Sequence, residues 1–305
     1  MSLNMISRLI KQYLAQLNPQ LLTTIEYFYT FKRMLNWKKP QDLNEKINWL
    51  KFYSDTSLWT RLADKYAVRT YVKECGFEDC LVKLYGKWDN EQDIDWEKLP
   101  CKFVMKVNNG SGDVLVCKDK NNLNIPETSQ RFGLLLKKNF SNYNGEPHYR
   151  DIKPCIIAEE LLDSRKQPVP VETLIDYKIW CFHGVPHHVW ACHNRRKGSV
   201  EVATYDLNWN RHDEYSIFTP HYKRAEITLP KPKSLNRMLE IAAALSKGIP
   251  QVRVDMYEVD GKPYFGEMTF TSAGGFMNFY TQYFLKEMGE LVDLSKADKK
   301  VRSDL

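Results

Sequence analysis

The feature that most constrains the fold is a series of short apolar strands that occur in pairs, with a short polar turn between the two members. Two-residue turns at His183-Gly184 and Asp260-Gly261 and a glycine-rich turn at 108–113 separate these strands. The predicted strand pairs are 103–107 with 114–117, 177–182 with 185–192, and 252–258 with 263–268. Such short connections join antiparallel neighbours. The pattern therefore predicts an α+β fold and disfavours a dinucleotide-binding domain, which needs alternating strands and helices.

Helical patterns dominate the first hundred residues. Apolar periodicity and capping residues predict helices at 5–17, about 20–35, 44–53, 60–75, 128–140 and 234–247. A further strand is predicted at 156–158. We expect a helical N-terminal region over 1–100, a small lid subdomain over 101–160, a C-terminal core subdomain over 161–295 and a polar tail over 296–305.

The net charge of +6 is concentrated at the N-terminal end of the chain. Residues 1–40 hold six basic side chains and one acid, so the rest of the chain is close to neutral. A nucleic-acid binder would carry its basic face through the main domain, so this class is disfavoured.

The predicted helix over 5–17 is amphipathic. Its apolar stripe consists of Ile6, Leu9, Ile10, Tyr13, Leu14 and Leu17. We expect this helix to pack on the body of the protein. The alternative is that the helix holds the protein at an anionic membrane surface.

Composition places the chain among ordinary globular proteins, at 43% hydrophobic and 27% charged residues. The seven cysteines form no close pairs of the kind that zinc or redox sites need, which favours reduced thiols and a cytoplasmic location. No apolar run reaches the length of a membrane span.

Lys106 lies midway along an apolar strand and precedes a Gly-Ser-Gly turn. Glycines let backbone N–H groups approach an anion, and a nearby lysine neutralises its charge. The pattern therefore predicts a phosphate-binding cradle. The alternative is a solvated edge-strand lysine beside an ordinary hairpin turn.

Two carboxylates on the last strand pair form the second candidate site. A turn centred near residue 261 places Asp255 and Glu267 almost opposite each other in an antiparallel hairpin. Facing carboxylates repel unless a cation lies between them, and carboxylates together with phosphates suit Mg²⁺. The alternatives are a solvated acidic pair or an ion pair between Arg253 and Glu267.

Another hairpin carries Lys178 and Arg195, which are placed to face one anionic group. Four histidines crowd the same hairpin without zinc-like spacing, and we expect structural roles for them. They are His183, His187, His188 and His193.

Six motifs follow one another in an order that resembles the ATP-grasp superfamily, in particular its TupA-like branch, named for teichuronopeptide biosynthesis. The motifs are Ala63-Asp64-Lys65-Tyr66, V-M-K with N-N-G-S-G, I-I-A-E-E-L-L, D-Y-K-I-W-C-F-H-G, V-R-V-D-M-Y and F-G-E-M-T-F. The similarity runs from about residue 25 to 294. It implies an ATP-grasp fold, in which two α+β subdomains grip ATP.

The resemblance also implies roles for individual residues. The residues expected to bind ATP are Lys65, Lys106, Asn109, Gly110, Ser111, Gly112, Glu159, Glu160, Leu162 and Asp176. Those expected to act in catalysis are Lys178 and Arg253, and the expected magnesium ligands are Asp255, Glu267 and Thr269. Thr269 departs from the superfamily, which usually has asparagine there, and a threonine oxygen binds a metal more weakly.

The implied activity is an ATP- and Mg²⁺-dependent carboxylate–amine ligase that acts through an acyl phosphate. The implied substrate is a surface polysaccharide, such as a capsule of the cell envelope, or its uronic acid, joined to an amino acid. The alternatives are a glycosyltransferase-like enzyme of polysaccharide biosynthesis and a non-catalytic ATP-grasp scaffold. A protein kinase is disfavoured, because the lysine precedes the glycine turn and no H-R-D or D-F-G motif follows.

Overall fold

The computed structural model describes residues 3–110, 112–138, 141 and 145–298. Its described helices are α1 (Leu3–Leu17), α2 (Pro19–Phe31), α3 (Leu43–Tyr53), α4 (Ser57–Ala63), α5 (Val68–Glu74), α6 (Ile125–Leu136), α8 (Leu235–Leu245) and α9 (Gln282–Glu290). Its described strands are β1 (Leu84–Trp88), β2 (Phe103–Val107), β3 (Val114–Cys117), β4 (Ile156–Glu160), β5 (Asp176–Phe182), β6 (Val185–Arg196), β7 (Ser199–Tyr205), β8 (Tyr222–Arg224), β9 (Val252–Val259) and β10 (Lys262–Thr269). The predicted α+β class is confirmed. Residues 299–305 of the expected polar tail lie outside the described part.

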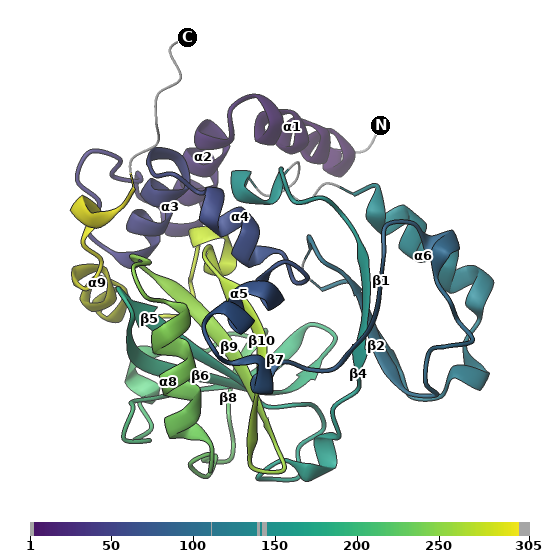
Figure 1. Ribbon diagram of the computed structural model, residues 1–305. Coiled ribbons are helices and arrows are strands. Elements are labelled where there is room, and N and C mark those ends of the chain that lie inside the picture. Colours follow the sequence, from purple (N-terminus) through teal and green to yellow (C-terminus); the bar gives the residue numbers. More distant parts are fainter. Residues whose placement is uncertain (1–2, 111, 139–140, 142–144, 299–305) are drawn as a thin grey trace.

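The strands form two separate sheets (Figure 1). The larger sheet has the order β10-β9-β5-β6-β7-β8 and lies in the same half of the molecule as α8. The smaller sheet has the order β1-β4-β2-β3, with α6 beside it. Helices α1 and α2 lie across the top of the molecule in this view. The chain thus has two α+β halves beneath an N-terminal pair of helices.

All three predicted strand pairs are confirmed as antiparallel hairpins. The two-residue turns have positive φ at both positions, with φ of 50° and 86° at His183 and Gly184 and of 56° and 68° at Asp260 and Gly261. This backbone twist matches that of the flanking strands, so it fixes which residues of the hairpins face each other.

The smaller sheet contains a strand that the sequence pattern did not predict. Strand β1 pairs antiparallel with β4 and precedes residue 101, so this sheet draws on the region expected to be helical. Strands β7 and β8 and helix α9 were also not predicted. The proposed division at residues 100 and 160 stays a prediction.

The predicted single helix over 60–75 is wrong, because the chain forms α4 and α5 with a break between them. Asp64 has an extended backbone, with φ −70° and ψ 112°. Its carboxylate accepts hydrogen bonds from the backbone N–H groups of Tyr66 at 2.8 Å and Ala67 at 3.1 Å. Aspartate competes for backbone donors in this way and so disfavours the helix interior. The break places Lys65 outside any helix.

The first helix packs on the rest of the protein with only part of its surface, and three residues of its apolar stripe stay exposed. Ile10, Tyr13 and Leu17 are 55%, 65% and 65% exposed, whereas Ala15 is buried. The side chains of Ile6 and Leu9 lie outside the described part. Among the described helices, none combines the length and apolar character that a bilayer crossing requires.

Candidate active site

A cavity of about 540 Å³ lies where both halves of the molecule meet the N-terminal helices. Helices α1 and α2 contribute one wall, and the break after α4, the glycine turn and the end of β10 contribute others. The lining residues are Lys11, Glu26, Tyr29, Thr30, Lys65, Gly110, Glu146, Tyr149, Arg253, Glu267, Thr269, Thr271, Ala273, Gly274 and Phe276. Of the residues predicted from the sequence, five line this cavity: Lys65, Gly110, Arg253, Glu267 and Thr269.

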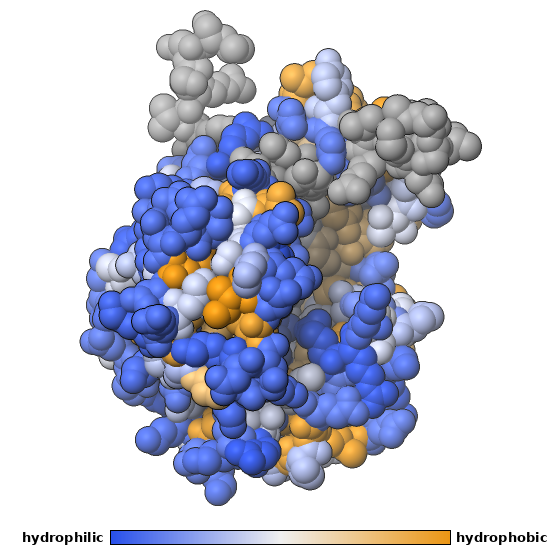
Figure 2. Space-filling model, turned by 90° about the vertical axis from the view of Figure 1, so that its right-hand side faces the viewer, coloured by the Kyte–Doolittle hydropathy of each residue, from blue (hydrophilic) through white to orange (hydrophobic). Residues whose placement is uncertain are grey.

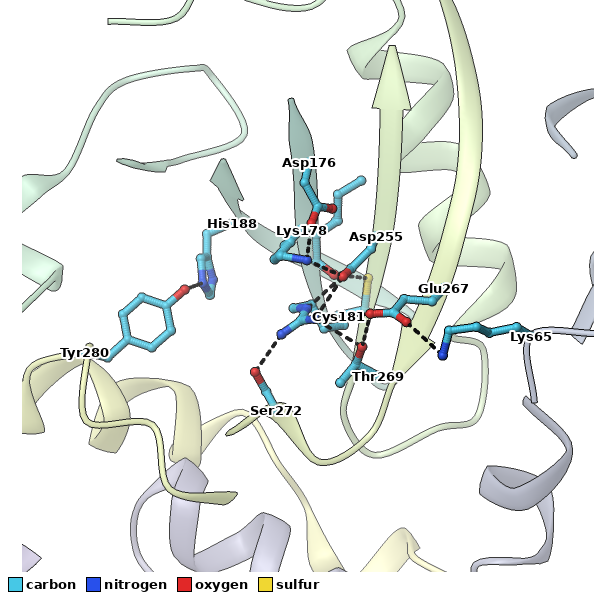
Figure 3. A network of polar contacts seen from close by, with 12 residues as sticks. Lys65, Asp176, Lys178, Cys181, His188, Asp255, Glu267, Thr269, Ser272 and Tyr280 are labelled. Carbon is cyan, nitrogen blue, oxygen red and sulfur yellow. Dashed lines mark hydrogen bonds and ion pairs between the residues drawn. The ribbon is translucent and has the colours of Figure 1, made fainter. Parts of the chain in front are cut away.

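Three charged residues form a row across neighbouring strands of the larger sheet (Figure 3). Lys178 on β5 pairs in register with Asp255 on β9, which pairs with Glu267 on β10. A β-bulge between Phe265 and Glu267 shifts the register by one residue. Without it, Glu267 would face Val254 and point to the opposite side of the sheet from Asp255. The predicted near-opposite placement of the two carboxylates is therefore confirmed.

Both carboxylate oxygens of Asp255 already have positively charged partners. The Arg253 guanidinium donates from Nε to Oδ1 at 2.7 Å and from its Nη2 atom to Oδ2 at 2.8 Å. The Lys178 ammonium lies 2.5 Å from Oδ2 of Asp255 and 2.5 Å from Oδ2 of Asp176. Asp255 and Lys178 are buried, at 1% and 6% exposure. Lys178 therefore sits between two carboxylates beneath the cavity surface.

Glu267 lies nearer to the cavity and is bound more loosely. Its carboxylate is 3.6 Å from Nζ of Lys65 and 3.8 Å from the Arg253 guanidinium. The Thr269 hydroxyl donates to it at 3.4 Å. The alternative of an ion pair between Arg253 and Glu267 is thus also realised, although the closer partner of Arg253 is Asp255.

This arrangement keeps Lys178 and Glu267 charged near neutral pH. Burial opposes a charge on Lys178, but the neighbouring Asp176 and Asp255 outweigh it and raise the pKa of that ammonium. Burial likewise opposes the charge of Glu267, but Lys65, Lys178 and Arg253 together lower the pKa of its carboxyl to about 2. Whether this site attracts a further cation or a further anion depends on which of these charged side chains a ligand displaces from its present partner.

The break after α4 aims Lys65 at the glycine turn. Its backbone N–H donates to the carbonyl of Asn108 at 3.2 Å, and its ammonium donates to the carbonyl of Gly110 at 2.6 Å. Asn108 holds the turn in place, because its side chain accepts from the N–H of Cys155 at 2.8 Å and donates to the carbonyl of Lys153 at 3.0 Å. The turn is thereby tied to the chain that precedes β4.

The other predicted residues of the glycine turn differ in burial. Asn109 is buried, and Gly112 has a φ of 85°, which favours glycine. Ser111 lies outside the described residues. The role of these residues in binding phosphate stays a prediction.

Lys106 belongs to an ion-pair cluster on the smaller sheet. Its ammonium lies 2.6 Å from Oε2 of Glu159, and Arg69 of α5 lies 2.8 Å from Oε1 of the same carboxylate. Lys106 is therefore not a solvated edge lysine, because β2 lies between β4 and β3 and its side chain is 18% exposed. Glu159 is held by two cations and positions Lys106. Glu160 at the end of β4 is exposed, and Leu162 after it is half-buried, so their predicted contacts with adenine and ribose stay predictions.

The residues present fit a magnesium ion only in part. Among the described residues, no group of three or more His, Cys, Asp or Glu is arranged to hold a metal. Glu267 and the Thr269 hydroxyl offer oxygens at the cavity, and Mg²⁺ commonly takes few protein ligands together with phosphate oxygens and water. Asp255 would have to exchange Lys178 for the ion, and Asp176 is placed to retain Lys178.

The four histidines are not members of the charged row, although Lys178 of that row is on the same hairpin, β5 and β6. His188 is buried and lies 3.2 Å from the Tyr280 hydroxyl (Figure 3). Its ring also stacks on that of Trp180. His193 is fully buried, and the ring of His183 accepts from the backbone N–H of Asp293 at 3.0 Å. These contacts support the structural roles expected for the histidines.

Several residues at the site have no signal in the local sequence. They are Arg69, Glu146, Thr271 and Ser272, together with Lys11, Glu26, Tyr29 and Thr30 of the helical wall. Ser272, for example, accepts from Arg253 at 2.7 Å across 19 residues of chain. Their places become visible only when distant segments meet.

No curated protein matches this chain in sequence. Among solved structures, the D-alanine–D-alanine ligase from Helicobacter pylori is 13% identical, with a TM-score of 0.44 and coverage of 86% of this chain and 68% of that one. The corresponding enzyme from Bacillus anthracis is 15% identical, with a TM-score of 0.41 and coverage of 72% and 60%. The phosphoribosylamine–glycine ligase from Thermotoga maritima is 12% identical, with a TM-score of 0.41 and coverage of 72% and 50%. This chain thus spans less than two thirds of the last two proteins.

The chain also matches a protein family. The family described as TupA-like ATP-grasp matches residues 45–293, which includes both sheets and every described residue of the charged row. The predicted resemblance is confirmed, and this chain belongs to the TupA-like ATP-grasp family.

Proposed function

We propose that the protein is an ATP- and Mg²⁺-dependent ligase that joins a carboxylate to an amine. The observation that carries this proposal is the convergence of Lys65, Arg253 and Glu267 on one cavity beside Gly110 of the glycine turn. Phosphoryl transfer depends mainly on positioning and charge neutralisation, and these groups supply both. Membership of the ATP-grasp family supports the same reaction class.

In the proposed reaction, a carboxylate oxygen of the first substrate attacks the γ-phosphorus of ATP, and ADP leaves. The amine then attacks the carbonyl carbon of the acyl phosphate, loses a proton and expels phosphate, which leaves an amide. Lys65 and Lys106 neutralise phosphate charge, and the glycine turn offers backbone N–H groups. Arg253 reaches the cavity and stabilises the charge that develops on the acyl phosphate.

The metal would be held by Glu267, by Asp255 after release of Lys178, and by Thr269 directly or through water. When bound, it supplies neutralisation of charge on the transferring phosphoryl group. Lys178 does not line the cavity, so we propose that it positions Asp255 and does not touch substrate. Asp176 would then hold Lys178 whenever Asp255 binds the ion. Asn109, Ser111, Gly112, Glu159, Glu160 and Leu162 complete the proposed ATP site.

We propose a uronic acid of a surface polysaccharide as the carboxylate and an amino acid as the amine, with the reaction at the cytoplasmic side of the membrane. The cavity supports a polar substrate of this kind, because threonine hydroxyls and charged side chains line it beside aromatic rings.

The test is a screen of uronic acids and amino acids for release of ADP and phosphate, followed by mass spectrometry of the product. We expect ADP release that requires both a carboxylate and an amine, and loss of that release in Lys106→Ala and Glu267→Ala. Both variants should remain folded, and the free energy of unfolding of Glu267→Ala should stay within about 1 kcal/mol of the natural protein.

Other outcomes would support other functions. Release of AMP, or full activity of either variant, would overturn the proposed chemistry or its site. Binding of a UDP-sugar without binding of ATP would support the glycosyltransferase alternative. Absence of Mg-ATP binding in calorimetry would support a non-catalytic scaffold.

A further inference from the structure

The N-terminal helices carry an apolar surface that the body of the protein does not cover. We define the hairpin face as six side chains on α1 and α2 that are between 37% and 65% exposed, namely Ile10, Tyr13, Leu17, Leu21, Ile25 and Phe28. Within each helix these residues follow helical spacing, so each set forms one stripe along its helix.

The other sides of the same helices are occupied. Ala15 of α1 and Leu22 and Tyr27 of α2 are buried. On the side of the cavity, Lys11 of α1 pairs with Glu26 of α2 at 2.6 Å, and both residues line the cavity. The hairpin face is therefore the part of the two helices that neither contacts the other helix or the body nor lines the cavity.

Apolar residues are also exposed elsewhere on the molecule. On the side of the molecule seen in Figure 2, apolar residues form separate patches among hydrophilic ones, and one patch lies at the top of the molecule. Large exposed apolar residues grouped on adjacent elements mark a surface that binds a partner. The question is which partner the chemistry fits.

The charge beside the hairpin face distinguishes between two possible partners, which are a second copy of the chain and an anionic bilayer. Lys32, Lys38 and Lys39 follow α2 and are exposed, and in the described part of the chain none of them forms an ion pair. Residues 1–40 carry six basic side chains and one acid. A second copy of the chain would bring two such basic regions together, whereas an anionic bilayer attracts them.

We propose that the helical hairpin of α1 and α2 lies on an anionic bilayer surface. The hairpin face enters the boundary between headgroups and acyl chains, and the three lysines contact lipid phosphates. The same hairpin forms one wall of the cavity, so the cavity would open close to the bilayer. This inference rests on surface chemistry and is independent of the proposed ligase reaction.

The experiment is flotation of the full-length protein with vesicles of phosphatidylcholine, with and without phosphatidylglycerol. We expect binding only to vesicles that contain the anionic lipid, and weaker binding as salt is raised. The variant Leu17→Asp with Phe28→Asp should lose at least about tenfold in vesicle affinity. The matched control is Leu134→Asp on α6, where the leucine is 65% exposed, and it should bind like the natural protein.

A second variant tests the electrostatic contribution. Lys38→Gln with Lys39→Gln should weaken binding by about fivefold for each lysine and should flatten the salt dependence. The hairpin residues changed here do not line the cavity, so any ADP release from soluble substrates should persist in both variants.

Three results would overturn the inference. These are failure of the full-length protein to float with anionic vesicles, equal binding by the Leu17→Asp, Phe28→Asp variant, and a dimer in analytical ultracentrifugation that the same variant abolishes. If the natural protein and all of these variants lack ligase activity but the natural protein still binds vesicles, the proposed function is contradicted and this inference is not.

Discussion

At the scale of single residues, Asp255 and Glu267 differ in what their removal costs. Asp255 is 1% exposed and holds Arg253 and Lys178, whereas Glu267 faces the cavity at longer distances from its partners. Removing one member of a buried ion pair leaves its partners uncompensated, at a cost of about 3 to 5 kcal/mol. Substitution of Asp255 should therefore mainly lower the free energy of unfolding, whereas substitution of Glu267 should mainly weaken ligand binding.

We predict that Asp255→Asn lowers the free energy of unfolding by about 3 kcal/mol, measured by urea denaturation. Glu267→Gln serves as the control and should change it by less than about 1 kcal/mol. Equal stability of the two variants would contradict the buried network described for Asp255.

His148 is a buried residue whose charge state makes stability depend on pH. Burial, aided by Lys51, lowers the pKa of its imidazole to about 3. Neither ring nitrogen has a hydrogen-bond partner in the described part of the chain, and the ring contacts Trp59 with centroids 5.6 Å apart. In the unfolded chain the imidazole takes up a proton below about pH 6.5. The unfolded state therefore binds more protons between pH 6.5 and 3, and stability falls as pH falls through that range.

We predict that the His148→Phe variant loses less stability than the natural protein between pH 7 and 5, by about 2 kcal/mol. The measurement is urea denaturation at both pH values. His221→Phe, at an exposed position, is the control and should not change the pH dependence. An identical pH dependence in the His148 variant would show that the buried imidazole does not govern acid sensitivity.

At the scale of elements, the break between α4 and α5 is what brings Lys65 to the cavity. The Asp64 carboxylate holds that break by accepting from two backbone N–H groups. A capping carboxylate contributes about 1 kcal/mol, which is small for the whole protein. Loss of the Asp64 carboxylate should nevertheless affect function, because the chain between α4 and α5 could then become helical and move Lys65 away from the cavity.

We predict that Asp64→Ala lowers the free energy of unfolding by about 1 kcal/mol and lowers ATP turnover by at least about tenfold. Asp64→Asn should retain most of both, since asparagine also accepts hydrogen bonds from the backbone. Urea denaturation and ADP release measure the two effects. Turnover that falls only in proportion to the folded fraction would argue against a positioning role for the break.

At the scale of the whole molecule, the proposed ATP site draws on both halves. Lys106 and the glycine turn belong to the smaller sheet, and Glu267 belongs to the larger one. A ligand that contacts both halves binds the folded protein and not the unfolded chain, so it stabilises the fold by mass action.

We predict that a non-hydrolysable ATP analogue with Mg²⁺, at about 100 times its Kd, raises the Tm by roughly 5 °C or more. Chelation of the metal should remove most of this rise in Tm for the natural protein. In Glu267→Gln, the chelator should not change whatever rise in Tm the analogue still causes. Differential scanning fluorimetry measures both. An unchanged Tm at saturating analogue would contradict the proposed nucleotide site.

Much of the fold and part of the site could be predicted because they depend on near neighbours in the chain. The two-residue turns determine the hairpins, and the hairpin around Asp260 and Gly261 brings Glu267 near Asp255. The β-bulge between Phe265 and Glu267, which has no such local signal, sets the register that pairs the two carboxylates. The prediction of a single helix over 60–75 is wrong, because the apolar periodicity continues through the segment and gives no sign that the Asp64 carboxylate binds the backbone there. The stripe of α1 was correctly predicted as helical, but its periodicity does not tell which surroundings it faces.

The sequence by itself determined most of the helices, the three strand pairs joined by short turns, the presence of both carboxylates on one hairpin and the family motifs in their order. Only the tertiary structure decided which charges meet, as when Lys178 reaches Asp255 across 77 residues of chain and Arg69 reaches Glu159 across 90. It also decided that α1 and α2 wall the cavity and leave their apolar face exposed. The physical reason is that backbone geometry acts within a few residues, whereas burial and charge pairing act between surfaces that folding brings together.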